Sequence, residues 1–151
     1  MRLFLVIPAS FLLCTTLFSM QKKASDYDAV FKILNSSKQV VLTSQVLSAT
    51  NKRHNEILVP MDSKIINVWL PGGCAIQIAT SAGIFEIETK REKVNHEYML
   101  TRVNLIKYLV KEVNSKYERD WLCMQNIPFK TLMQIHARVN DDGSVQIAEG
   151  Q

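Results

Sequence analysis

Cysteine, proline and glycine are all scarce in this chain of 151 residues, which contains three, four and five of them. So few prolines and glycines exclude a long flexible linker and a collagen-like repeat. The formal net charge is only +4, which is too small to indicate nucleic-acid binding by itself. Hydrophobic residues form 47% of the chain, so we expect one globular domain of ordinary size.

Catalytic and metal-binding motifs are missing as well. The chain contains no GxSxG, P-loop or GxGxxG motif, and it has neither CxxC nor HExxH. Its three histidines, His54, His96 and His136, lack the short repeated spacing of metal ligands. We therefore expect a protein that is not an enzyme and that needs no metal or cofactor.

The N-terminus has the pattern of an export signal. Arg2 supplies a positive charge, and the apolar stretch from Leu3 to Phe18 is shorter than the ~20 residues that a membrane-spanning helix needs. Ser19 is a small residue suited to the position before cleavage. The pattern predicts a signal peptide over residues 1–19 and a secreted protein; the alternatives are an uncleaved anchor and a lipid on Cys14.

Two cysteines, Cys74 and Cys123, remain after removal of that segment. In an exported chain, two cysteines most simply form a single disulfide. The alternative is two buried free thiols. A catalytic cysteine would require a nearby histidine, and no histidine is placed beside either cysteine by the sequence.

Two segments have the pattern of helices. Residues 25–34 begin with the N-cap candidates Ser25 and Asp26, and a short helix is predicted there. Residues 96–113 place apolar side chains three and four positions apart, which predicts one long amphipathic helix. The side chains on that spacing are Met99, Val103, Ile106 and Val110.

The remaining chain favours strands. Residues 75–88 alternate apolar and polar side chains around a TSAG turn and predict a β-hairpin, followed by a charged loop over residues 89–93. Two further strands are expected at residues 119–125 and 131–139. An NDDG turn then precedes a frayed tail. The order of these elements predicts an α+β protein with an antiparallel sheet.

From Ala75 to Cys123 this order resembles the B subunits of cholera toxin and heat-labile enterotoxin, the receptor-binding pentamers of one-A, five-B bacterial toxins. Both have a hairpin, a charged loop, a long helix and a strand with a Leu-Cys pair. The residues that carry the resemblance are Phe85, Glu88, Leu122, Cys123, Asn126 and Pro128, with a weaker similarity over residues 55–66.

The resemblance implies an OB-fold-like barrel with five or six antiparallel strands in a Greek-key order, a fold that binds oligosaccharides. It also implies a homopentamer whose long helices line a pore for a catalytic A subunit. Its implied ligand is a glycan on the host cell surface. The corresponding glycan-binding residues would be Glu88, Asn126, Lys93, Tyr98 and Gln125.

The chain departs from the family pattern in three places. The family's first cysteine falls near Ser48, so Cys74 would have to replace it as the partner of Cys123. Gln125 stands where the family has the aromatic residue on which the sugar stacks, and Tyr98 or Trp121 would have to supply that surface. Residues 20–43 form an extension that the family lacks, which leaves residues 44–151 as the binding domain.

These observations together predict a secreted, non-enzymatic, glycan-binding B subunit of an enterotoxin-like toxin. The alternatives are a monomeric periplasmic inhibitor or immunity protein of α+β fold, and a lipid-anchored accessory protein of a secretion system.

Overall fold

The structure of the chain, a computed structural model, describes residues 29–47, 53–68, 74–130 and 132–150. The predicted signal peptide lies outside these residues. Within them, no helix is long and apolar enough to cross a membrane. Every regular element of the described ranges is a strand: β1 (Ala29–Asn35), β2 (Val41–Leu47), β3 (Arg53–Leu58), β4 (Ser63–Val68), β5 (Cys74–Thr80), β6 (Gly83–Val94), β7 (Glu97–Val113), β8 (Lys116–Pro128), β9 (Met133–Val139) and β10 (Val145–Glu149).

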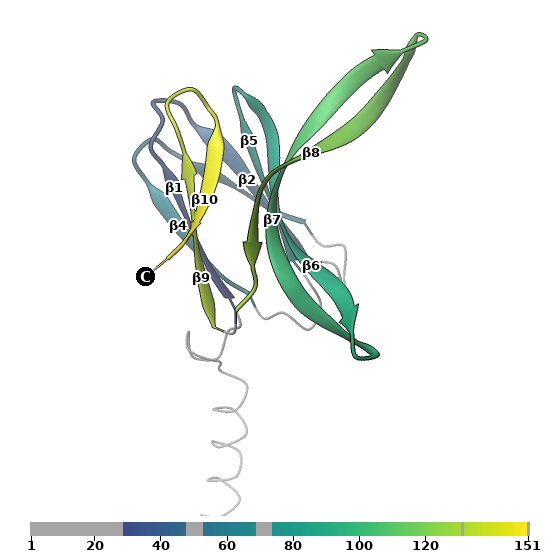
Figure 1. Cartoon of the computed structure of the whole chain (residues 1–151). Helices are drawn as coiled ribbons and strands as arrows, with labels where there is room; N and C mark the ends of the chain where they lie inside the picture. The colour runs from purple at the N-terminus through teal and green to yellow at the C-terminus, as the bar shows by residue number, and fades with distance from the viewer. Residues whose placement is uncertain (1–28, 48–52, 69–73, 131, 151) are drawn as a thin grey trace, which may run out of the picture.

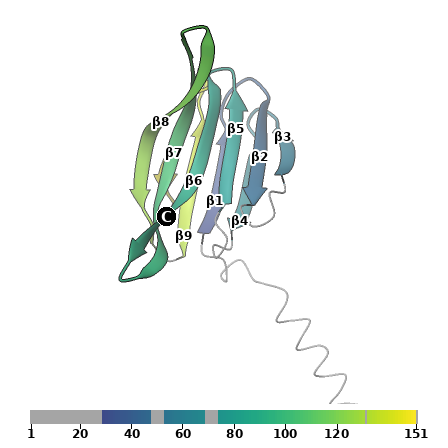
Figure 2. The ribbon, with the colours of Figure 1, turned by 90° about the vertical axis from the view of Figure 1, so that its right-hand side faces the viewer.

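The strands form two sheets that pack face to face (Figures 1 and 2). One sheet has four strands in the order β10-β9-β1-β4, and the other has six in the order β3-β2-β5-β6-β7-β8. Neighbouring strands are antiparallel except β1 and β9, which are parallel. The mostly β, largely antiparallel architecture is confirmed, whereas the predicted closed barrel is wrong, because the two sheets remain separate ladders.

One hydrophobic core fills the space between the sheets. Alternate residues of most strands point into it, as the two-residue period of a strand requires, whereas β3 contributes only Leu58 and β8 contributes no fully buried residue. The four-stranded sheet contributes Ala29, Phe31, Ile33, Ile66, Met133, Ile135, Ala137, Val139, Val145 and Ile147. The six-stranded sheet contributes Val41, Leu58, Ile76, Ile78, Phe85, Ile87, Val103 and Leu105.

Strand β1 corrects the prediction of a short N-terminal helix. The described part of that segment is extended, and its burial alternates along the strand, with Phe31 and Ile33 in the core. The strand lies at the centre of the four-stranded sheet, between β4 and β9. The boundary predicted after residue 43 falls inside β2, so residues 29–43 belong to the sandwich and are not an appended extension.

Strand β7 corrects the prediction of a long helix over residues 96–113. Val103 and Leu105 face the core, while Asn104 and Ile106 on the opposite face are also buried. Burial on both faces places apolar residues at consecutive positions and hides the two-residue alternation. The many β-branched and aromatic residues of the segment nevertheless favour a strand.

Tight turns bound β7 at both ends. Asn95 and His96 have positive φ angles of 51° and 69°, and Asn114 and Ser115 have positive φ angles of 51° and 61°. Two consecutive residues with positive φ make a turn whose twist matches that of an antiparallel hairpin. Because the first of these turns lies at Asn95 and His96, strand β6 continues up to Val94. The segment over residues 89–93, which was predicted to be a loop, is part of this strand.

The hairpin predicted over residues 75–88 is confirmed as β5 and β6, with Thr80 opposite Gly83 across the turn. The strands predicted at residues 119–125 and 131–139 correspond to β8 and β9. The C-terminal tail, predicted to be frayed, instead forms β10 and pairs with β9.

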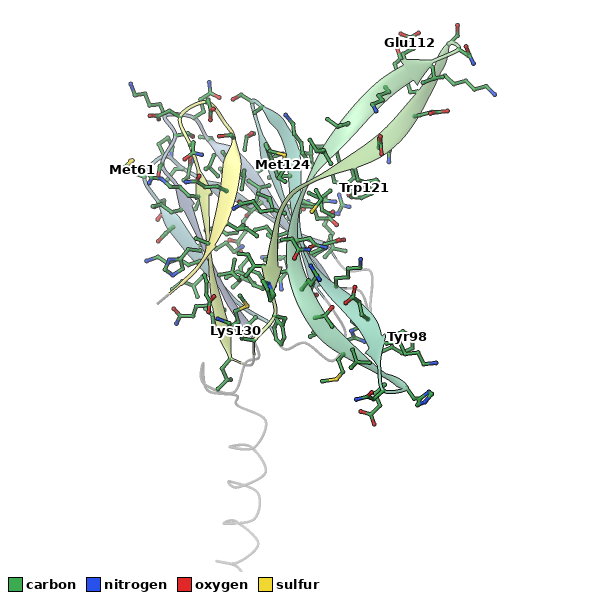
Figure 3. The ribbon with its side chains drawn as sticks, in the orientation of Figure 1. Met61, Tyr98, Glu112, Trp121, Met124 and Lys130 are labelled. Atoms are coloured by element: carbon green, nitrogen blue, oxygen red, sulfur yellow. The ribbon has the colours of Figure 1, made fainter. Side chains whose placement is uncertain are left out.

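Two long hairpins extend beyond the body of the sandwich (Figure 1). The β6–β7 hairpin ends at Asn95 and His96, and the β7–β8 hairpin ends at Asn114 and Ser115 on the opposite side. Figure 3 shows Tyr98 near the end of the first hairpin, Glu112 near the end of the second, and Trp121 near the base of the second.

Candidate functional site

The candidate site is the outer face of the six-stranded sheet, which faces the viewer in Figure 2. Residues that alternate with the core side chains of β5, β6 and β7 point to this face. Several are polar yet little exposed: Glu86 and Asn104 have only 8% and 7% of their surface accessible. Buried polar groups require hydrogen-bond partners, and both residues find them on neighbouring strands.

The first set of such groups, which we call the Glu86 cluster, consists of Gln77, Glu86 and Tyr108. Glu86 Oε2 accepts a hydrogen bond from Gln77 Nε2 at 2.8 Å and one from the Tyr108 hydroxyl at 2.8 Å. Gln77 Nε2 also lies 3.2 Å from the Tyr108 hydroxyl oxygen. The three side chains come from three adjacent strands, so the sheet itself holds the Glu86 carboxylate in place.

Tyr108 remains a neutral donor in this cluster. Burial raises the pKa of its phenol, and the hydrogen bond to Glu86 raises that pKa further, to about 12. The Tyr108 ring also lies against Trp121 of β8, with 3.9 Å between ring centroids and 45° between planes. Trp121 is half exposed, so an apolar surface open to solvent adjoins the Tyr108 ring, whose hydroxyl donates to the Glu86 carboxylate.

A surface cavity of about 390 Å³ lies beside the Glu86 cluster. Its walls combine aliphatic side chains, two arginines and two members of the cluster. They are formed by Arg53, Gln77, Ile84, Tyr108, Leu109, Val110 and Arg119. The cavity therefore brings together positively charged hydrogen-bond donors, a side-chain amide and an aromatic ring.

A second polar set, which we call the Asn104 ladder, crosses β6, β7 and β8. Asn104 Nδ2 donates to Glu88 Oε1 at 3.2 Å, and Asn126 Nδ2 donates to Asn104 Oδ1 at 2.7 Å. Arg102 then donates from Nη1 to Asn126 Oδ1 at 3.0 Å. Glu88 lies two residues after Glu86 on β6, so the ladder and the Glu86 cluster share one face.

The predicted site residues are thus only partly brought together. Glu88 and Asn126, predicted to share a pocket, belong to one ladder, but Asn104 lies between them. Lys93 and Tyr98 are opposite each other near the tip of the β6–β7 hairpin. Lys93 is five residues from Glu88 along β6, roughly 16 Å at the usual rise of a strand.

Gln125 points away from this face and joins the two sheets. Its Nε2 donates to the Ile147 carbonyl at 3.0 Å, and its Oε1 accepts from the Ile147 amide N–H at 2.6 Å. The side-chain amide therefore bonds to the outer edge of β10 as a neighbouring strand would. The structure places Gln125 in a structural role.

The predicted disulfide between Cys74 and Cys123 is not formed, because Cys123 is an exposed free thiol. The order of the strands in the sheet gives the reason. Cys74 lies on β5 and Cys123 on β8, with β6 and β7 between them. Three inter-strand steps separate the two backbones by roughly 14 Å, whereas the Cα atoms of a disulfide are usually about 4.4–6.8 Å apart.

Sequence reasoning missed the residues at the centre of this face: Gln77, Glu86, Asn104, Tyr108, Arg53 and Arg119. Glu86 and Gln77 could have been found, since each is a polar residue between two core residues of a predicted strand. Asn104 and Tyr108 were hidden by the helical interpretation of their segment. The described residues include no group of three or more His, Cys, Asp or Glu side chains that could hold a metal ion.

No protein-family model matches the chain, and no curated protein matches it. Two structural features implied by the toxin resemblance, the long helix and the bridged closed barrel, differ from the structure found.

Proposed function

We propose that this chain is a secreted, non-enzymatic binding module that recognises carbohydrate on the outer face of its six-stranded sheet. One observation carries the proposal: a carboxylate held by two hydrogen bonds adjoins an accessible pair of aromatic rings. Glu86 supplies the carboxylate, and Tyr108 and Trp121 supply the rings. The export signal expected at the N-terminus supports a ligand outside the cytoplasm.

Sugar rings present two kinds of surface, and the outer face has a counterpart for each. Adjacent hydroxyls need fixed acceptors and donors. Gln77 and the two arginines that line the cavity would supply donors, and the Glu86 carboxylate beside Gln77 would supply an acceptor. The C–H side of a sugar ring needs a flat apolar partner, which the half-exposed Trp121 would supply. The Asn104 ladder extends the polar surface for a second sugar unit.

The proposal is limited to binding. The helix expected to line the pore of a toxin pentamer is strand β7, so delivery of a catalytic A subunit is not part of it. The module is proposed to be non-enzymatic because the chain carries no recognised catalytic motif.

A glycan array on the purified protein, followed by calorimetry with the best ligand, tests the proposal. Glu86→Gln removes the negative charge and one acceptor oxygen, and it should weaken binding by about tenfold or more, since hydrogen bonds to charged groups contribute about 1.5–3 kcal/mol. Trp121→Ala removes the flat apolar surface for the sugar ring and should weaken binding by a similar factor. Matched controls are Glu118→Gln and Tyr98→Ala, which change exposed residues outside this face and should leave binding unchanged.

Two results would contradict the proposal. One is an array without a bound glycan. The other is equal binding by wild type, Glu86→Gln and Trp121→Ala when denaturation curves show all three to be folded. Loss of binding in Tyr98→Ala alone would instead place the site at the tip of the β6–β7 hairpin.

A further inference from the structure

Two arginines from opposite ends of the six-stranded sheet line the cavity beside the Glu86 cluster. Arg53 comes from β3 and Arg119 from β8, the first and last strands in the order of the sheet. Gln77 and Tyr108, on strands between them, line the same cavity. Arg119 also lies close enough to Tyr108 for its positive charge to oppose the rise in the pKa of the phenol. The two guanidinium groups therefore flank one site on the outer face.

Both arginines lack a counter-ion within the described part of the chain, because neither Arg53 nor Arg119 forms an ion pair there. The other walls of the cavity include the aliphatic side chains of Ile84, Leu109 and Val110. A charge pair that is partly buried against such walls is screened by salt much less than a pair in open solvent. The cavity is therefore a favourable place for a ligand to supply the missing negative charge.

The balance of charge at this cavity is positive. Among the described residues, its walls contain two arginines and no aspartate or glutamate. The Glu86 carboxylate beside the cavity offsets one of these charges, and it accepts hydrogen bonds from Gln77 and Tyr108. A neutral sugar would leave the remaining positive charge unpaired. A sugar with an acidic group would neutralise it, and a guanidinium group can donate two parallel hydrogen bonds to such an oxyanion.

We propose that the ligand of the outer face is an acidic glycan, whose carboxylate or sulfate group pairs with the arginines that flank the cavity. Hydroxyls of the same glycan bond to Gln77 and Glu86. The inference rests on the carbohydrate binding proposed above and adds the class of sugar. Arg53 and Arg119 then determine specificity, since they distinguish a charged sugar from a neutral one of the same shape.

A glycan array with neutral, carboxylated and sulfated members, followed by calorimetry, tests the inference. The best carboxylated glycan should bind at least about tenfold more tightly than its methyl ester, since esterification removes the charge and leaves the hydroxyls in place. A sulfated glycan should show the same difference from its desulfated form, so the array distinguishes the two acidic groups. The preference should become smaller as the salt concentration rises.

Substitution of each arginine by glutamine tests where the acidic group binds. Arg53→Gln and Arg119→Gln should each weaken binding of the acidic glycan by about tenfold, because a charge-assisted hydrogen bond is lost. Binding of the neutral form should change little, since glutamine still donates to hydroxyls. Arg138→Gln is the matched control, because it removes the same charge from an exposed position of β9 in the other sheet. Its affinity for both forms should equal that of wild type.

The possible failures of the inference are distinguishable from those of the proposed function. Equal binding of the acidic glycan and its neutral form overturns the inference, as does an acidic preference that both arginine variants retain. An array that binds only neutral glycans also overturns it but leaves the proposed carbohydrate site in place. An array without any bound glycan overturns both.

Discussion

Replacing Gln125 with alanine should destabilise the fold without affecting ligand binding. The change removes both hydrogen bonds to the Ile147 backbone, at 2.6 and 3.0 Å, and leaves an N–H and a carbonyl without their partner at the edge of β10. Each such bond contributes about 0.5–1.5 kcal/mol, so the free energy of unfolding should fall by about 1–3 kcal/mol. The upper half of that range is expected because Ile147 is only 3% exposed.

Urea denaturation followed by circular dichroism measures this loss, and thermal unfolding should show a decrease of about 2–4 °C per kcal/mol. Gln146→Ala is the matched control, because Gln146 is an exposed residue of β10 and its loss should change stability by less than about 0.5 kcal/mol. A Gln125→Ala protein as stable as wild type would refute the structural role. Weaker glycan binding at unchanged stability would show instead that Gln125 contacts the ligand.

Three further predictions concern the core, the Glu86 cluster and the free thiol. Phe31→Ala should lower the free energy of unfolding by about 3–5 kcal/mol in urea denaturation, because Phe31 is 1% exposed in the core. The control Ile65→Ala, at a 62% exposed position of β4, should lower it far less. Equal losses in the two variants would contradict the packing. Tyr108 should titrate near pH 12 in the folded protein, so its contribution to stability is complete below pH 10 and is lost as the pH rises toward 12. Phenolate absorbance compared with that of Tyr108→Phe measures this titration, and Glu86→Gln should lower the pKa of Tyr108. Cys123 should react with a maleimide in the native, unreduced protein, as judged by peptide mass mapping, whereas recovery of a peptide joining Cys74 and Cys123 would contradict the sheet order.

Local sequence signals predicted those parts of the fold that local contacts determine. The β5–β6 hairpin joins neighbouring segments through a short turn, and its alternation is visible because the large apolar residues of β5, Ile76 and Ile78, lie on one face. β1 depends on distant partners instead: Phe31 lies opposite Ile135 of β9 and Ile66 of β4. No pattern within residues 25–34 reports such a parallel pairing, so the N-cap pair made a helix the simpler interpretation.

The interpretation of residues 96–113 failed for a different reason. Of the four apolar residues on the spacing of three and four positions, only Val103 and Ile106 are buried, on opposite faces of the strand, whereas Met99 and Val110 are exposed. The signals that distinguish the alternatives were the turn dipeptides Asn95-His96 and Asn114-Ser115, both of which adopt positive φ. Asparagine tolerates that region better than most residues, so each dipeptide marks a hairpin turn.

Two β-bulges determine which side chains meet on the outer face, and no sequence pattern predicted these bulges. Thr101 is the extra residue of β7 opposite β6, and Met124 is the extra residue of β8 opposite β7. A shift of one residue moves a side chain to the other face of a sheet. Without the first bulge, Glu88 would lie opposite Val103, and Asn104 would no longer be its partner. Without the second bulge, Asn104 would lie opposite Gln125, and Asn126 would leave the ladder. The polar outer face therefore depends on two single-residue insertions in long hairpins. Glu88 and Asn126 were predicted from the toxin resemblance, whereas the helical interpretation of residues 96–113 hid Asn104, which lies between them.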